Sequence, residues 1–186
     1  MQANDQEFLR ALHEEKITAQ NERANYVTKK MAFVTVLFTL SSINAEIQIA
    51  EVYWLLYFIP LVAICYDSYI MSADARVKRI GAFLGRHPDS VAGVVEKQWE
   101  HFSARYRSAF APFTDMFLSI LVTIAAAIYL YSQQHSVFTE GIKLLFASWL
   151  VISLTVITGL WFKHRGLIKQ IDSYDPSSIV NPLHST

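Results

Sequence analysis

Apolar residues gather in long stretches along this chain, and charged residues are concentrated in the segments between them. Three stretches are almost free of charge over about 20 residues, the length that a helix needs to cross the hydrocarbon of a bilayer. They are Val52–Ser72, Phe113–Ser132 and Ile142–Phe162. The pattern therefore predicts three transmembrane helices.

A fourth stretch, Met31–Ile43, is also apolar apart from threonine and serine, but it is shorter and polar residues follow it. We predict a span over 27–44, in which Lys29 and Lys30 at the start extend their ammonium groups to the headgroups. The polar residues after this span then form a turn into the next one. The alternative is one long bent segment in which Glu46 is buried.

The segments between the spans carry helical patterns of their own. Residues 4–25 predict a helix that runs into the first span. Beyond Ser72, apolar residues recur at steps of three and four until Gly85, which predicts that the second span continues past the membrane. Asp89 and Ser90 predict the start of another helix, ending near residue 110. Its apolar face comprises Val91, Val95, Trp99, Phe102 and Tyr106.

This second helix makes residues 73–111 an antiparallel helical hairpin, whose apolar stripes pack together or onto a partner subunit. We divide the chain into an N-terminal helix (1–26), a first membrane hairpin (27–72), the helical hairpin (73–111), a second membrane hairpin (112–162) and a tail (163–186). The predicted fold class is an all-α integral membrane protein with four transmembrane helices.

Composition agrees with this class. Hydrophobic residues are 53% of the 186 and charged residues 17%, against about 25% charged in an average soluble domain. Such apolar content excludes disorder as the main state. Cys65 is the single cysteine, so a disulfide within the chain and a cysteine-built metal site are both excluded.

The distribution of positive charge orients the four spans. With the N-terminus inside, fifteen of the sixteen lysines and arginines lie on the inner side, and Lys143 alone lies outside. Because inner loops of membrane proteins are rich in lysine and arginine, this predicts a multi-pass membrane protein with both termini in the cytoplasm. The net charge is zero, which excludes a uniformly basic nucleic-acid binder.

Small and polar residues form a stripe on the third span, and they are our candidates for a pore or gate. Asp115, Ser119 and Thr123 follow one another at steps of four, and Asp67 lies near the inner end of the second span. The stripe either lines a wet pathway or lets helices pack closely and bond through hydroxyl groups.

The two carboxylates are the strongest candidates for a functional role. An ionised side chain at membrane depth costs free energy, so its presence there by default suggests a function. Asp67 and Asp115 lie near the inner border of the membrane, where Lys78 or Arg107 can pair with them. A structural ion pair or helix cap is therefore the alternative to a role in gating or permeation.

A basic edge on the inner side is the candidate site for an anionic ligand. It consists of Arg76, Arg79, Arg86, Lys97, His101 and Arg105. Lipid headgroups fit such an edge, and the neighbouring Trp99 also suits a single-stranded nucleic acid. The alternative is that membrane orientation alone places these charges there. Trp99 and Phe102 are the candidates for docking a cytoplasmic effector or regulator.

Signatures of enzymes are absent from the sequence. It contains no HExxH, no phosphate-binding loop and no GxSxG, and its six histidines are scattered. Asp74-Ala75-Arg76 matches only part of the signature of lipid-headgroup transferases, since the following glycine and two later aspartates are missing. We predict no enzyme, no cofactor and no metal site.

One region resembles a known group of proteins. Tyr66-Asp67-Ser68-Tyr69, the run from Arg76 to Leu84, and Trp99-Glu100 resemble a pattern in small bacterial four-span proteins, including membrane components of two-gene antiphage defence operons. The layout is similar to the channel subunit of the Hailong system and the membrane subunit of the Kiwa system. The shared pattern covers about 35 residues. The resemblance implies a homo-oligomer, a tetramer, controlled by a cytoplasmic partner, and in the Hailong case an ion channel restrained by a DNA oligomer.

Two functions remain open from the sequence. The first is an oligomeric inner-membrane ion channel or pore-type effector of antiphage defence, whose cytoplasmic helices bind a regulatory ligand. The second is a membrane anchor or sensor that conducts no ions and docks a cytoplasmic effector. A lipid-modifying enzyme requires a catalytic cluster assembled from separated residues.

Overall fold

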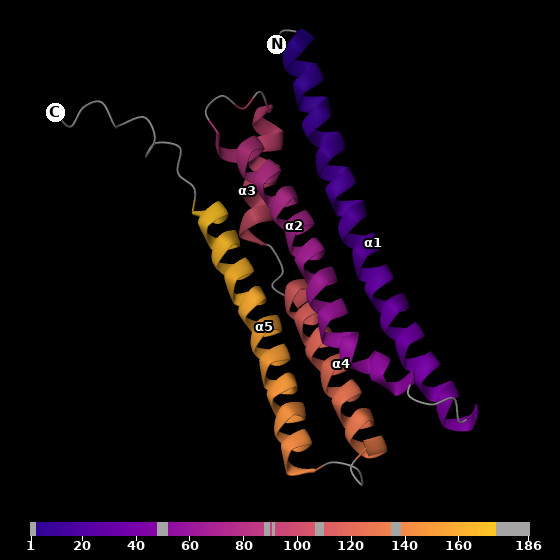
Figure 1. Ribbon diagram of the computed structural model, residues 1–186. Helices are drawn as coiled ribbons and strands as arrows, with labels where there is room; N and C mark the ends of the chain where they lie inside the picture. Colours follow the sequence, from indigo (N-terminus) through magenta and orange to yellow (C-terminus); the bar gives the residue numbers. More distant parts are fainter. Residues whose placement is uncertain are drawn as a thin grey trace, which may run out of the picture. The chain divides into compact units, whose positions relative to one another are not determined.

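The computed structural model describes residues 3–47, 52–87, 90, 92–106, 110–134 and 139–173, and within these ranges it contains helices and no strands (Figure 1). This confirms the predicted all-helical class. Among the described residues, three helical segments are long and apolar enough to cross a membrane: Trp54–Arg86, Phe113–Gln133 and Glu140–Asp172. They contain the three charge-poor stretches of the sequence, apart from residues 52 and 53. The first predicted span is not among them, so the arrangement with four spans stays a prediction.

Helix α1, Ala3–Ile47, is a single helix of 45 residues. The predicted N-terminal helix and the first predicted span therefore form one continuous element, as expected. At 1.5 Å per residue the helix is about 65 Å long, more than twice the hydrocarbon thickness of a bilayer. The polar turn predicted over residues 44–51 starts later than expected, because α1 continues through residues 44–47. The burial of Glu46, on which the alternative depends, lies outside the described residues.

Two of the other three long helices have a proline in their first turn. A 3-10 helix, η1 (Val52–Phe58), leads into α2 (Ile59–Arg86), and Pro60 is the second residue of α2. Pro112 is likewise in the first turn of α4 (Phe110–Gln134). Proline is tolerated there because the first amide groups of a helix have no partner within it. The last helix, α5, covers Glu140–Asp172.

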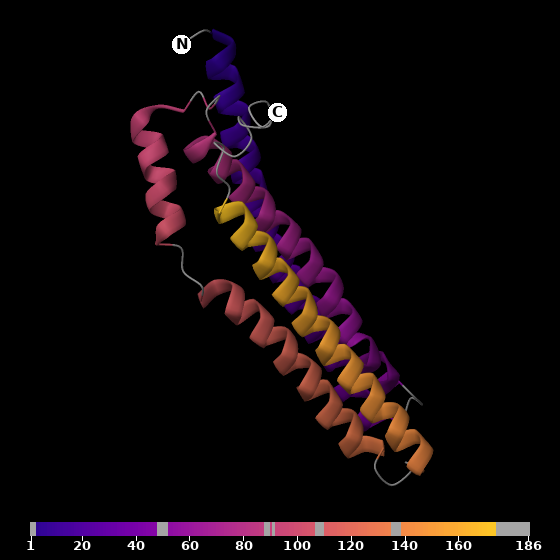
Figure 2. The ribbon, with the colours of Figure 1, turned by 90° about the vertical axis from the view of Figure 1, so that its left-hand side faces the viewer.

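The short helix α3 covers Val94–Arg105, so both predicted ends of this helix were wrong (Figure 2). It begins after Gly93, which provides no side-chain cap. The Ser90 hydroxyl, expected to cap this helix, instead donates to the carbonyl oxygen of Leu84 at 2.9 Å, near the end of α2. Ser90 therefore stabilises the turn out of α2 rather than the start of α3. Asp89, the other predicted cap, lies outside the described residues.

The chain divides into two compact units. The polar unit comprises residues 1–23, 71–109 and 163–186, and the apolar unit comprises 24–70 and 110–162. Since α1, α2 and α5 each contribute residues to both units, the division falls within helices. It separates the charged helix ends from most of the apolar stretches.

The apolar unit has a core to which several helices contribute. Its buried residues are Val34, Leu37, Leu56, Ile59, Val122, Ala126 and Leu130. Phe146 and Trp149 of α5 pack against this core. The remaining surface of α5 is strongly apolar, with Leu145 72% exposed and Phe162 69% exposed. An exposed apolar surface of this kind suits contact with lipid.

In the polar unit α1 packs against α2. Ile80 and Leu84 of α2 are buried, with Leu9 and Leu12 of α1 against them. Phe8 meets Phe83 edge to face, with ring centroids 6.2 Å apart. The predicted apolar stripe on this part of α2 therefore faces α1.

The apolar face of α3 does not pack on that stripe, in contrast to one of our two predictions for the hairpin. Instead Glu100 of α3 lies against α2, where two glycines leave room for it. A Cβ atom added at Gly81 would lie 2.7 Å from Oε2 of Glu100, and one at Gly85 would lie 3.1 Å from its Cβ. Contact between α2 and α3 therefore depends on the missing side chains of these glycines.

Candidate functional site

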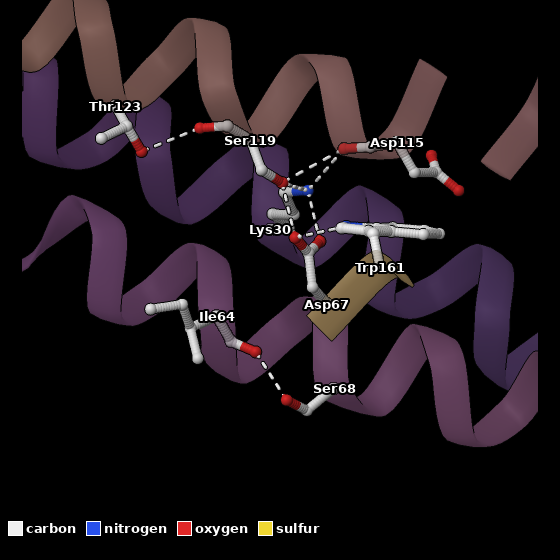
Figure 3. Close-up of polar contacts among 8 residues, drawn as sticks. All are labelled: Lys30, Ile64, Asp67, Ser68, Asp115, Ser119, Thr123 and Trp161. Carbon is white, nitrogen blue, oxygen red and sulfur yellow. Dashed lines mark hydrogen bonds and ion pairs between the residues drawn. The ribbon is translucent and has the colours of Figure 1, made fainter. Parts of the chain in front are cut away.

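The apolar unit contains a buried ion pair between α1 and α2. Nζ of Lys30 donates a hydrogen bond to Oδ1 of Asp67 at 2.7 Å (Figure 3). The side chains are only 2% and 1% exposed. Burying two charges is expensive, and their attraction repays this only if further hydrogen bonds satisfy the remaining protons and lone pairs.

Two more helices provide those hydrogen bonds. The hydroxyl group of Ser119 on α4 donates to Oδ2 of Asp67 at 2.7 Å. The indole N–H of Trp161 on α5 donates to the same oxygen at 3.2 Å. Lys30 also donates to the Ser119 hydroxyl oxygen and, at 3.4 Å, to the carbonyl oxygen of Asp115. We call Lys30, Asp67, Ser119 and Trp161 the buried charge cluster.

The cluster is saturated with hydrogen bonds. All three protons of the Lys30 ammonium group have acceptors, and the carboxylate of Asp67 accepts from three different side chains. Because the groups come from α1, α2, α4 and α5, one residue from each, the cluster ties four helices together (Figure 3). Networks of this kind are stable when every member is satisfied and costly when one member is lost.

The predicted polar stripe of α4 belongs to this region. Ser119 and Thr123 are both fully buried. Thr123 donates its hydroxyl proton to the carbonyl oxygen of Ser119 at 2.8 Å, one helical turn earlier. Asp115 takes part through its main-chain oxygen. In this structure Ser119 and Thr123 are therefore inside the unit and bonded to protein groups, while Asp115 is half-buried.

Two expectations about the charges were wrong. Lys30 does not extend toward solvent, since its side chain turns inward to Asp67. The partner of Asp67 is Lys30 rather than Lys78, and Lys78 instead binds Asp74. Arg107, the other predicted partner, lies outside the described residues. A sequence signal did exist, since Lys30 and Trp161 lie at the same end of their predicted spans as Asp67.

A second ionic cluster lies in the polar unit, beyond the stretch Val52–Ser72. Asp74 of α2 binds Lys78 one turn later. Its other partners are Nε2 of His164 on α5 at 3.0 Å and the guanidinium group of Arg23 on α1 at 3.4 Å. Asp74 therefore joins three helices. This network gives Asp74 a structural role that its partial resemblance to a transferase signature did not suggest.

The pKa of Asp74 reflects opposing effects. Burial raises the pKa, but hydrogen bonds with His164 and Lys78, together with the positive charges of Lys78 and Arg23, outweigh it. The result is a pKa lowered from 3.8 to about 2. The carboxylate thus stays ionised over the whole physiological pH range.

Polar contacts with acidic side chains also hold α3 on α1. Lys16 of α1 pairs with Glu100, and Nε2 of His13 lies 2.6 Å from Oε1 of Glu96. Both acidic side chains of α3 therefore turn toward α1.

The six candidates for an anionic ligand do not form one continuous site. Arg76 binds Glu22 at 3.2 Å, Arg79 is exposed and Lys97 is half-buried. Three others line an open groove of about 570 Å³: Arg86, His101 and Arg105, together with Phe102, Ala104, Tyr106 and Asp172. Arg86 also donates to the carbonyl oxygens of Ile171 and Asp172 near the end of α5.

The two docking candidates are accessible. Trp99 is 62% exposed and Phe102 is 54% exposed, and their rings stack with centroids 6.0 Å apart. Within the described part of the chain, no three His, Cys, Asp or Glu side chains converge as a metal ion requires.

Comparisons with protein-family models, with curated proteins and with solved structures find no match for this chain. Its function must therefore be inferred from the two clusters, the groove and the exposed face of α3.

Proposed function

We propose that this chain is a subunit of an oligomeric inner-membrane ion channel, in which the buried charge cluster holds the closed state. The observation that carries the proposal is the Lys30–Asp67 pair inside the apolar unit. Ionisable residues within membrane helices are rare, and where they occur they typically mark ion pathways, proton relays or gates. Here the pair is joined by hydrogen bonds to all four long helices.

The buried charge cluster favours the fully formed arrangement, and we call it the lock because it would hold the channel closed. When it is formed, each partner satisfies the others, so intermediate arrangements with one bond missing are unfavourable. If α1 and α2 separate, the ammonium group, the carboxylate and the hydroxyl group of Ser119 lose partners and require water, while Thr123 keeps its bond within α4. Opening would therefore create a wetted polar path along α4, which is the pore or gate role predicted for Asp67, Asp115, Ser119 and Thr123.

Assembly and regulation complete the proposal. Four helices of one chain, closed by a saturated cluster, leave no pathway of their own, so conduction requires several copies. The positive charges of the sequence support a position in the inner membrane with both termini in the cytoplasm. The limited resemblance to antiphage membrane proteins supports a homotetramer, a cytoplasmic regulator and a role in defence. The defence role is tested by a phage challenge of bacteria that carry this gene together with the adjacent gene, since the proteins that the chain resembles are encoded in two-gene operons.

Ion flux into liposomes tests the lock. The purified chain is reconstituted as the wild type, as Asp67→Asn, as Lys30→Met and as the double variant Lys30→Met/Asp67→Leu. The single variants leave a buried group unsatisfied, so we expect them to raise flux above the wild-type level. The double variant replaces the pair by apolar side chains, so its flux should stay low.

Asp74→Asn is the matched control, because it breaks an ionic cluster in the polar unit instead. It should leave flux at the wild-type level. If both single variants are incorporated as folded oligomers and neither raises the ion flux above the wild-type level, the proposed lock is wrong.

A second candidate function is the membrane anchor or sensor that conducts no ions. The saturation of the cluster favours it, since a fully bonded core also suits a rigid support. In that case the flux is nil for every variant, while substitution of Trp99 or Phe102 abolishes binding of the cytoplasmic effector.

A further inference from the structure

Helix α3 exposes one strongly apolar face. Val95 is 79% exposed, Trp99 62%, Phe102 54% and Tyr106 67%. The three aromatic rings form a continuous row, in which Trp99 and Phe102 are stacked with centroids 6.0 Å apart and Tyr106 is tilted against Phe102 at 4.6 Å. These side chains fall within one side of the helix, at steps of three and four.

The charges of α3 are sorted between its two sides. Glu96 and Glu100 face α1, where His13 and Lys16 are their partners. The basic residues His101 and Arg105 are exposed. The accessible side of α3 is therefore aromatic and positively charged, because its acidic groups are held by another helix. Such a surface complements a partner that is both apolar and anionic.

A groove beside these aromatic residues is likewise lined by basic and apolar side chains. Arg86 of α2, His101 and Arg105 lie along its wall, and Phe102 and Tyr106 provide the apolar part. Asp172 is the single acidic residue in its lining. A phosphate group with attached hydrocarbon fits this combination, since guanidinium groups bind phosphate oxygens and the rings contact the chain.

The position of α3 in the sequence brings it close to a membrane. Tyr106 follows its last helical residue, and the candidate membrane helix Phe113–Gln133 starts seven residues later. Even fully extended, that connection reaches only about 25 Å. An amphipathic helix with aromatic residues on one face and basic residues beside them typically lies in the interface of an anionic bilayer.

We propose that α3 is an interfacial helix that binds the anionic inner leaflet. Its aromatic face enters the boundary between headgroups and acyl chains, and the groove of Arg86, His101 and Arg105 receives a phospholipid phosphate. This proposal concerns the lipid contact of the polar unit and does not depend on ion conduction.

A fluorescent label on α3 tests the proposal in the full chain. Val95→Cys is introduced in a Cys65→Ser background and labelled with a dye whose emission shifts to the blue in lipid. The protein is reconstituted in vesicles of phosphatidylcholine, with or without one third phosphatidylglycerol. The same dye at Ala11→Cys, an exposed position of α1, is the matched control.

We expect a blue shift of the Val95→Cys label, and quenching by spin-labelled lipid, that are stronger in the vesicles with phosphatidylglycerol. The control should respond equally in both. Arg105→Glu and His101→Glu are exposed substitutions, and each should weaken the lipid-bound state by about fivefold or more.

Two results would overturn the proposal. In the first, the Val95→Cys label stays in water in both kinds of vesicle. In the second, it shifts only after a single-stranded oligonucleotide or a cytoplasmic protein is added, which would assign the face of α3 to that partner.

Discussion

At the scale of single residues, Lys30 and Asp67 determine how the apolar unit is held together. Each side chain is nearly inaccessible to solvent, and the two oppositely charged groups lie 2.7 Å apart. Removing one partner leaves an uncompensated buried charge, whereas replacing both by apolar residues removes the desolvation cost together with the attraction. Single and double variants therefore have opposite expected effects.

The first prediction is that Lys30→Met destabilises the chain by about 3–5 kcal/mol, and that adding Asp67→Leu restores most of this loss. Thermal unfolding in detergent measures both. Lys143→Met is the control, because the Lys143–Glu140 pair is exposed and such pairs contribute about 1 kcal/mol or less. Equal losses for Lys30→Met and Lys143→Met would rule out a dominant role for the buried pair.

The second prediction concerns Asp74 in the polar unit. Because its pKa falls from 3.8 to about 2 on folding, the ionised carboxylate contributes about 2 kcal/mol of stability at neutral pH. A lowered pKa means that this contribution is present above about pH 4 and is lost as the pH falls through about 2. Asp74→Asn should therefore be less stable than the wild type at neutral pH.

The difference between Asp74→Asn and the wild type should shrink as the pH is lowered from about 4 to about 2. Unfolding midpoints in detergent across this range measure it. Glu15→Gln, at an exposed position of α1, is the control and should show little difference at any pH. A constant difference across the range would mean that Asp74 stabilises the fold by something other than its charge.

At the scale of elements, the sequence pattern predicted the long helices better than the short one. Stretches of membrane length that are almost free of charge gave three helices, and the helix predicted for residues 4–25 runs into the first predicted span within α1, as expected. Both are properties of contiguous residues. The predicted start of α3 was wrong because the Ser90 hydroxyl had two possible partners, the first amide groups of the next helix or the carbonyl oxygen of Leu84, and it donates to Leu84.

The contact between α2 and α3 depends on Gly85, and this gives the third prediction. Gly85→Leu must displace Glu100, whose Cβ would lie 3.1 Å from a Cβ at this position, so we expect a loss of stability. Gly166→Leu is the control in α5, where nothing lies within 4 Å, and it should be neutral or gain up to about 1 kcal/mol. Thermal unfolding of both variants in detergent provides the comparison, and equal effects would show that α3 does not need the glycine.

At the scale of the whole molecule, the division into a polar and an apolar unit follows directly from the charge pattern. The residues of the candidate site were only partly predictable. Asp67 and Ser119 were candidates because they are polar within apolar stretches, but Lys30 and Trp161 were not recognised as their partners. Periodicity shows which face of a helix a residue occupies. It does not show which helices are neighbours, and the partners of a buried charge depend on exactly that information.

The number of spans gives the fourth prediction. With four spans the two termini lie on the same side of the membrane, and with three they lie on opposite sides. In a Cys65→Ser background, Ala11→Cys and Gln170→Cys should both react with an impermeant maleimide only in inverted vesicles. Thr139→Cys should react from the outer side. If the two ends are labelled from opposite sides of the membrane, α1 does not cross the membrane.

The membrane potential of bacteria that express the chain tests the proposed gate most directly. With equal amounts of protein in the membrane, a potential-sensitive dye should report depolarisation for Asp67→Asn. The wild type and the double variant Lys30→Met/Asp67→Leu should leave the potential unchanged. If the cells that express Asp67→Asn stay fully polarised, the buried charge cluster is not the lock of a channel, and the anchor becomes the better explanation of this fold.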